Sequence, residues 1–353
     1  MTNIFNYTLA ELEKTLIESG YKKFNATQIF EWIYDKYELN FDKMSNLSND
    51  LRKYLQKNFT NETFEELVNQ TSSDGTIKIL FKLSDNKTIE TVLMPQQYGN
   101  TICITTQVGC NMACTFCASG LIKKQRNLDV SEIVRQVWIM NNMLKNTNET
   151  NSDLTRISNV VVMGIGEPFD NYDNVMKALD ILNNAKALAI GSRHITVSTC
   201  GVIPKIMEFS ERKMQINLAI SLHAPNNEIR SEIMPINKAF PLEKLMQAVD
   251  YYLAKTNRRV TFEYILIDKV NDSNENAREL AELIKGKNGY VNLIPYNEIN
   301  ENTYKRSKNI DNFFRILKKS GINAVVRHEY GLDIDAACGQ LRVKREGVLN
   351  NAF

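Results

Sequence analysis

The sequence lacks any apolar stretch long enough to cross a membrane, and its first residues lack the basic and then apolar pattern of an export signal. It also lacks a strong charge of either sign, with 43 basic and 41 acidic side chains and a net charge of +2. We therefore expect a cytoplasmic protein with no membrane partner. The overall charge gives no reason of its own to expect nucleic acid.

No internal repeat, low-complexity tract or long linker rich in proline, glycine or serine divides the chain. The composition, 43% apolar and 24% charged over 353 residues, is that of an ordinary globular protein. Disorder and fibrous repeats are excluded, and the length favours about two domains.

The first third of the chain predicts a helical domain followed by a β connector. Residues 1–66 hold three helical patterns: one with capping-box spacing at Thr8 and Glu11, one capped by Asn25 and running to Tyr34, and one capped by Ser48 and ending near Phe59. This segment carries 8 basic and 11 acidic side chains and no motif for chemistry. We expect a helical accessory domain over residues 1–70 and a β hairpin within residues 71–98, with strands at 76–81 and 88–93.

Residues from about 99 to 330 alternate between β-branched runs and segments of helical period, which predicts successive βα units and a parallel sheet. The expected strands are 101–105, 159–163, 195–198, 216–221, 260–267, 290–294 and 324–327, with helices near 242–255, 275–286 and 309–320. Periodicity alone does not choose between an open doubly wound sheet and a full or partial barrel. Both architectures place chemistry at the carboxyl ends of the strands.

Three of the six cysteines form a CxxxCxxC cluster, Cys110, Cys114 and Cys117, directly after the first strand of this series. A chain in a reducing compartment does not need disulfides, so its cysteines are candidates for metal ligands or reactive thiols. Thiolates are soft ligands that suit zinc or an iron–sulfur cluster, and a structural zinc site would want a fourth ligand. Three thiolates and one open metal position is the interpretation that we favour.

Polar residues follow the other predicted strands at the same edge of the sheet. Gly164 and Gly166 permit close backbone approach to a ligand, and the Glu167 carboxylate can accept hydrogen bonds from an ammonium group. The same edge holds Ser198, Ser221, Leu222, His223 and Asn297. Any one of them alone is more often a capping or turn residue, but their recurrence at successive strand ends favours a binding site.

These motifs resemble the radical S-adenosylmethionine (SAM) superfamily, in which three cysteines hold a [4Fe-4S] cluster. Together with the segments 163–168, 221–225, 234–237 and 331–341, they resemble the RlmN/Cfr family of RNA adenine methyltransferases over nearly the whole chain. The resemblance implies an RNA-binding role for the helical domain, a partial (β/α)6-type barrel over residues 99–330, and a C-terminal segment, 331–353, that carries a methyl-carrier cysteine.

The resemblance also implies roles for individual residues. Cys110, Cys114 and Cys117 would bind one [4Fe-4S] cluster, whose open iron is chelated by SAM, with two SAM molecules used per turnover. The residues expected to contact SAM are Gly166, Glu167, Ser198, Ser221, Leu222, His223 and Asn297.

Three further residues would act in methyl transfer. Cys338 would be methylated first and lose a hydrogen atom from its S-methyl group, so that the resulting methylene radical adds to the adenine ring. Cys103 would resolve the cysteine–RNA adduct through a transient disulfide with Cys338, and Glu90 matches the family's catalytic glutamate. A radical route suits adenine C2, because that carbon has no lone pair to attack a methyl group. Cys200 receives no role.

The resemblance implies 23S ribosomal RNA and transfer RNA as substrates, a reducing electron donor such as flavodoxin, and a monomer. Pro168, Ala224 and Pro295 resemble the C2-specific branch rather than the C8-specific Cfr branch. The rivals are C8 specificity with antibiotic resistance, another radical SAM reaction, and a non-catalytic RNA-binding protein with structural zinc. The candidate phosphate contacts are Lys123, Lys124, Arg126, Arg342, Lys344 and Arg345.

Overall fold

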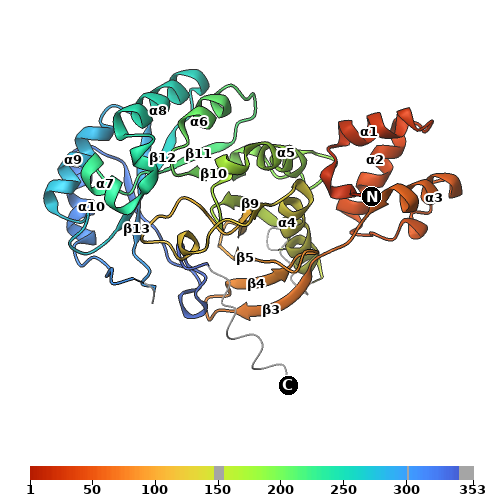
Figure 1. The fold of residues 1–353 in the computed structure, drawn as a ribbon, viewed down its shortest axis with the longest axis horizontal. Coiled ribbons are helices and arrows are strands. Elements are labelled where there is room, and N and C mark those ends of the chain that lie inside the picture. The colour runs from red at the N-terminus through yellow and green to blue at the C-terminus, as the bar shows by residue number, and fades with distance from the viewer. Residues whose placement is uncertain (147–154, 300–301, 342–353) are drawn as a thin grey trace.

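The computed structural model describes residues 1–146, 155–299 and 302–341. Its amino-terminal part holds α1 (Leu9–Glu18), α2 (Phe24–Phe30) and α3 (Asn49–Asn58), set to one side of the molecule in Figure 1. Two predicted caps are confirmed: Thr8 and Glu11 form a reciprocal capping box, and Ser48 accepts the Leu51 N–H. The predicted Asn25 cap is wrong, because α2 begins at Phe24 and Asn25 instead accepts the N–H of Lys22 from inside the first turn.

The helical domain shares one continuous apolar core with the rest of the chain. Phe5 and Tyr34 pack edge-on, Phe5 also packs against Trp138 of α4 (Val130–Lys145), and the Trp138 indole N–H donates to the Ile33 carbonyl at 2.7 Å. These contacts fix the domain on the first helix of the βα series.

An antiparallel β hairpin follows, with β4 (Ile77–Lys82) and β5 (Thr88–Met94) paired as predicted. A further edge strand, β3 (Glu65–Thr71), lies where no strand was expected. Its side chains are mostly exposed and polar, so it carries no apolar alternation by which a sequence pattern could be recognised.

Seven parallel strands continue the same sheet, close to their predicted positions. They are β6 (Asn100–Cys103), β9 (Ile157–Val162), β10 (Ile195–Thr199), β11 (Asn217–Ser221), β12 (Val260–Leu266), β13 (Gly289–Pro295) and β14 (Ala324–Val326). The connecting helices after α4 are α5 (Tyr172–Asn183), α6 (Ile203–Ser210), α7 (Asn227–Ile233), α8 (Leu242–Thr256), α9 (Asn274–Ile284) and α10 (Ile310–Lys319).

The sheet runs β14-β13-β12-β11-β10-β9-β6-β5-β4-β3, and its two edge strands are not joined to each other. Short pairs, β1 (Thr2–Asn3) with β2 (Phe59–Thr60) and β7 (Gln107–Val108) with β8 (Arg126–Asn127), lie outside it. Helices α6 to α10 cover the outside of the curved sheet (Figure 1). The fold is therefore an α/β partial barrel, which settles the alternative that periodicity left open.

None of the helices in the described part of the chain is both long enough and apolar enough to cross a membrane.

Candidate active site

The three clustered cysteines lie on one loop, wound back on itself after β7. The Cys110 N–H donates to the Ile122 carbonyl at 2.8 Å, and the Cys117 N–H donates to the Cys114 carbonyl at 3.2 Å. The loop is tight enough that a Cβ on Gly120 would lie 2.8 Å from the Cys114 carbonyl oxygen. All three cysteines line one cavity of about 160 Å³, which we call the cysteine-loop cavity.

The three thiols carry no charge when nothing is bound to them. Burial raises the pKa of Cys110 to about 12, and burial also raises the pKa of Cys114 and Cys117. Within residues 1–146, 155–299 and 302–341, no three His, Cys, Asp or Glu side chains are grouped closely enough to hold one metal ion. An iron–sulfur cluster binds each cysteine at a different iron, so its ligands lie further apart than the ligands of a single metal ion.

In the segment after β9, Gly164 and Gly166 leave no room for a side chain. A Cβ on Gly164 would lie 2.7 Å from the Ile104 carbonyl oxygen, and a Cβ on Gly166 would lie 2.7 Å from the Gln107 side chain. Gly166 also has φ +107°, a conformation that side chains rarely adopt. Both glycines line the cysteine-loop cavity, but it is packing against the chain after β6 that requires them.

Glu167 presents a buried carboxylate at the wall of the same cavity. Its two oxygens accept the N–H of Phe169 at 3.0 Å and the N–H of Cys200 at 2.8 Å. Burial raises its pKa, and these N–H donors act against that effect. Because each carboxylate oxygen accepts more than one hydrogen bond, the predicted contact with an ammonium group remains open to it.

The predicted strand-end residues divide into two groups. Ser198 and Ser221 line the cysteine-loop cavity with their hydroxyls 3.3 Å apart, and His223 lines it as well. Leu222 is fully buried in the main core and does not line the cavity, so only its backbone is near the site. Asn297 lines a neighbouring cavity instead.

His223 is held neutral in an uncommon backbone conformation. Burial lowers its pKa to about 3, and its Nδ1 accepts the Ile265 N–H at 3.1 Å. That hydrogen bond leaves the proton on Nε2 as a donor. Its φ of +56° is rare for a side chain other than glycine, and Asn271 holds the backbone there by donating to the His223 carbonyl at 2.7 Å.

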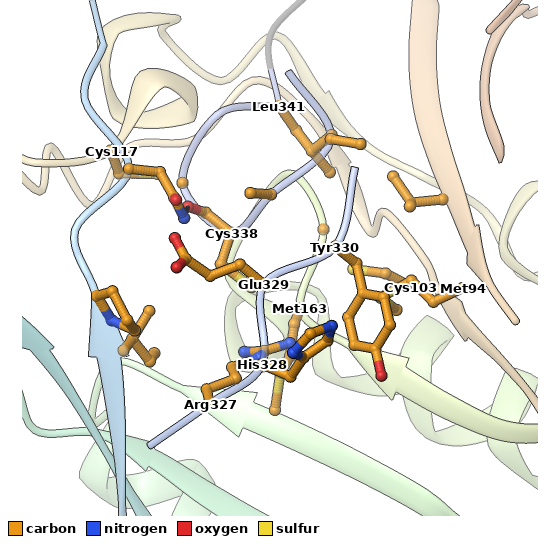
Figure 2. Close-up of a pocket in the computed structure, with 18 of the residues that line it drawn as sticks. Met94, Cys103, Cys117, Met163, Arg327, His328, Glu329, Tyr330, Cys338 and Leu341 are labelled. Atoms are coloured by element: carbon orange, nitrogen blue, oxygen red, sulfur yellow. Dashed lines mark hydrogen bonds between the residues drawn. The ribbon is translucent and has the colours of Figure 1, made fainter. Parts of the chain in front are cut away.

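Cys103 and Cys338 lie far apart in the sequence but line one cavity of about 60 Å³, which we call the two-cysteine cavity. Figure 2 shows them in this cavity together with Cys117. Cys338 also lines the cysteine-loop cavity, so it stands where the two cavities meet. Burial raises the pKa of Cys103 to about 12, and Cys338 adds to that effect. Both thiols are free, so the predicted transient disulfide stays a prediction.

The loop that carries Cys338, residues 331–341, is held from three sides. Asn297 donates to the Cys338 carbonyl at 3.2 Å, and the Ala118 N–H of the cysteine loop donates to the Gly339 carbonyl at 2.8 Å. On the third side, Asp74 of the turn between β3 and β4 accepts the Gly331 N–H at 2.9 Å. These contacts place the Cys338 backbone against the cysteine loop.

Glu90 lies on β5, on the same face as Val92, which pairs with Cys103 and lines the two-cysteine cavity. Glu90 itself is buried but does not line either cavity. Its carboxylate lies 3.8 Å from the buried Lys78 ammonium, which donates to the carbonyls of Ile334 and Asp335. Glu90 is thus joined through Lys78 to the loop that carries Cys338.

Several residues of the site were not found from the sequence. Arg327 and Met163 line both cavities, and Glu263 of β12 lines the cysteine-loop cavity. Glu263 had a usable signal, because it is the one charged residue in the strand 260–266, all of which is buried. Arg230 is fully buried and donates to the carbonyls of Leu222, Ser221 and Cys200, so it holds two strand-end segments together.

Cys200, which received no role, is not a remote core residue. It lines the cysteine-loop cavity, its N–H donates to Glu167 and its carbonyl accepts from Arg230. Its thiol is also a side-chain hydrogen-bond partner of the Glu167 carboxylate.

Two of the predicted phosphate contacts are paired with carboxylates of the chain itself. Lys124 pairs with Asp170 at 2.6 Å, and Arg126 pairs with both Asp85 and Glu132 at 2.7 Å, so their charges are already neutralised. Lys123 is exposed. Arg342, Lys344 and Arg345 lie outside the described residues.

The donor set fits both a cluster and SAM. Three soft thiols face one cavity, and a buried carboxylate and a neutral imidazole donor share that cavity. In the neighbouring cavity, the buried Oδ1 of Asn297 has no hydrogen-bond partner within the described chain, although its amide is anchored to Cys338. A buried acceptor of this kind is costly unless a ligand donates to it.

The fold and this site define a radical SAM protein. Residues 104–281 match the model of the radical SAM superfamily, and a crystal structure of a radical SAM methyltransferase from Sphaerobacter thermophilus superposes with a TM-score of 0.91 at 40% identity, covering 97% of this chain and 99% of that one. Residues 2–60 match the ribosomal RNA large subunit methyltransferase N-terminal domain.

Full-length relatives narrow the class to one family. The chain is 60% identical over 349 residues to a probable dual-specificity RNA methyltransferase RlmN of Spiroplasma citri, and 54% identical over 357 residues to one of Enterococcus faecalis, covering 99% of both chains in each case. The chain therefore belongs to the RlmN family of RNA methyltransferases.

Proposed function

We propose that this enzyme methylates C2 of adenine in 23S ribosomal RNA and in transfer RNA, through an S-methyl group carried on Cys338. The position of Cys338 supports the proposal most directly. Its side chain stands between the cavity of the three cluster cysteines and the cavity that holds Cys103. A methyl carrier needs access to both the methyl source and the base that receives the methyl group.

The cluster and SAM, when bound, would supply the methyl group and the radical that removes a hydrogen atom from it. Cys110, Cys114 and Cys117 would hold the cluster, and Glu167, Ser198, Ser221 and His223 would surround SAM in the cysteine-loop cavity. Glu167 offers a carboxylate to the SAM ammonium, and His223 offers an Nε2–H donor.

Residues around the two-cysteine cavity would resolve the cysteine–RNA adduct. Cys103 would attack the sulfur of Cys338 to release the methylated base. The pKa of Cys103 is raised by burial, so it is a neutral thiol at rest and must lose its proton for that step. Glu90 lies two residues along β5 from the partner of Cys103, and its link through Lys78 to the Cys338 loop suits a role in proton transfer there.

We further propose that two SAM molecules are used per turnover, that a small reducing protein such as flavodoxin supplies the electron, and that the enzyme acts as a monomer in the cytoplasm. For this chemistry, an electron must reach the cysteine loop. Lys123 and Leu121 of that loop are exposed, so a reductant has access to it.

C8 specificity is the alternative within the same chemistry, and the resemblance of Pro168, Ala224 and Pro295 to the C2-specific branch favours C2. The reconstituted enzyme, incubated with SAM, reductant and RNA transcripts, should yield 2-methyladenosine on digestion and mass analysis. The Cys338→Ala variant should keep its iron and produce no methyladenosine. A product of 8-methyladenosine alone, or full methylation by Cys338→Ala, would contradict the proposal.

A further inference from the structure

The amino ends of the parallel strands surround a third and larger cavity, of about 500 Å³, which we call the amino-end cavity. This volume is in the range of sites that hold small molecules. The barrel interior there is polar, in contrast to the apolar interior of a closed, packed barrel. The inward-facing residues of successive strands are Thr101, Asn159, Thr196, Asn217, Thr261 and Asn292.

The mouth of the amino-end cavity is cationic. Arg193 and Arg259 are exposed at its rim, and each has an uncharged partner: Arg193 donates to Gln215 at 3.0 Å, and Arg259 lies over the Tyr290 ring at 5.1 Å. Neither forms an ion pair within the described part of the chain. Among the described residues that line the cavity, Glu263 is the one acid, and it is buried at the inner end. Two arginines without carboxylate partners suit an anionic ligand.

Aromatic side chains accompany these arginines. Tyr98 is 74% exposed, Tyr290 lies beneath Arg259, and Tyr330 packs edge-on against His328 at 4.7 Å. Arginines beside exposed aromatic rings are the usual surface for single-stranded nucleic acid, because phosphates bind the arginines and bases stack on the rings.

The amino-end cavity leads to the reactive cysteines. It shares Met94, Met163, Arg327, His328 and Tyr330 with the two-cysteine cavity, and Figure 2 shows these five residues around Cys103 and Cys338. The opposite end of the barrel is occupied by the cysteine loop, with the Cys338 loop bonded onto it. Of the two ends, the amino end is therefore the more open to a large substrate.

We propose that RNA enters the barrel at the amino ends of the strands, with phosphates next to the target adenine bound by Arg193 and Arg259 and a flanking base stacked on Tyr98 or Tyr290. This inference rests on the proposed function, since it supplies the RNA-binding surface for that reaction. The unpaired adenine would then pass inward, beside Arg327, to the sulfur of Cys338. Cofactor and RNA would meet at Cys338 from opposite ends of the barrel.

The test replaces both rim arginines by glutamine, separately and together, in the reconstituted enzyme. The probe is an RNA stem–loop with an unpaired adenine in its loop, titrated at several salt concentrations. Each lost phosphate contact should reduce the slope of log affinity against log salt by about 0.7. The double variant should bind roughly tenfold more weakly and methylate with a raised KM but a nearly unchanged kcat.

Arg278→Gln is the matched control, because Arg278 is exposed on the outer helix α9 and pairs with Glu275 at 2.9 Å. This control variant should leave the salt slope of RNA binding and the KM unchanged. Methylation of Cys338 without RNA should be normal in every variant, which shows that the cofactor end is intact.

Two failures are distinguishable. If the unaltered enzyme methylates the RNA and the double variant keeps its salt slope and KM, the proposed entrance is wrong and the proposed function stands. If the unaltered enzyme binds the RNA but never methylates it, the proposed function is wrong, and the binding slopes still decide whether the entrance is correct.

Discussion

The two ends of the barrel differ in almost every physical property. The carboxyl end holds five cysteines, a buried carboxylate and a neutral histidine, each fixed by backbone hydrogen bonds or by close packing. The amino end is wide, polar and cationic, with arginines at its rim that pair with no carboxylate of the described residues. The first arrangement suits chemistry that must exclude water. The second suits reversible binding of a charged polymer.

This difference assigns different kinetic consequences to the two ends. Substitutions at the carboxyl end should reduce turnover with RNA affinity intact, whereas substitutions at the amino end should weaken RNA affinity with turnover intact.

Cys114→Ser should abolish methylation and remove the iron, because it deletes one of three soft ligands at the carboxyl end. Iron and sulfide analysis after anaerobic purification measures the loss, and the brown colour should disappear. Cys200→Ser is the matched control, since it changes a neighbouring thiol of the same cavity that is not among the three predicted ligands, and serine keeps a hydroxyl donor beside Glu167. Equal iron content in the two variants would remove Cys114 from the ligand set.

Lys78→Met should lower kcat roughly 10- to 100-fold and leave RNA affinity unchanged. Its ammonium holds the carbonyls of Ile334 and Asp335 and lies beside Glu90, so its loss frees the loop of Cys338 and leaves a buried carboxylate without its cation. Steady-state kinetics separates kcat from KM. Lys82→Met is the control, because Lys82 lies on β4 like Lys78 but pairs with the exposed Glu65 of β3. A rise in KM alone would place Lys78 in RNA binding.

Asp74→Asn should loosen the Cys338 loop slightly. The difference between this variant and the unaltered protein should depend on pH. Burial acts to raise the pKa of Asp74, but the N–H groups of Gly331 and Thr76 outweigh it and lower that pKa from 3.8 to about 2. A lowered pKa means that the clamp contributes stability above pH 3.8 and loses it as the pH falls through about 2.

Hydrogen exchange of the Gly331 amide, in cluster-free protein, measures this clamp. The unaltered protein should protect that amide at neutral pH and lose the protection near pH 2, whereas Asp74→Asn should protect it weakly at both. Equal protection in the two proteins at neutral pH would contradict the clamp.

Local sequence patterns were sufficient to predict most of the fold. The capping box at Thr8 and the cap at Ser48 act within one helical turn, so their residues are adjacent in sequence. The parallel strands were recognisable by their β-branched runs, and their boundaries differ from the predictions by only a few residues. Edge strand β3 was missed because exposure on both faces leaves no such pattern.

The site was predictable to the extent that its residues are consecutive. Cys110, Cys114 and Cys117 fall within one loop, and the two strand-end serines lie in the last residues of β10 and β11. Arg193, Arg259 and Arg327 come from three distant segments and share a cavity only because the barrel closes around it. The glycines after β9 could be found from the sequence, but their packing role could not, since their Cβ clashes involve residues 104–107, a distant segment after β6.

The passage of the methyl group through Cys338 is the central claim, and one isotopic measurement tests it directly. The enzyme is supplied with SAM whose methyl group carries three deuterium atoms, and the methyladenosine from the RNA is weighed by mass spectrometry. If Cys338 carries the methyl group and loses a hydrogen atom before the base is attacked, the new methyl group should retain two deuterium atoms. Retention of all three would show direct transfer from SAM to RNA and would contradict the account.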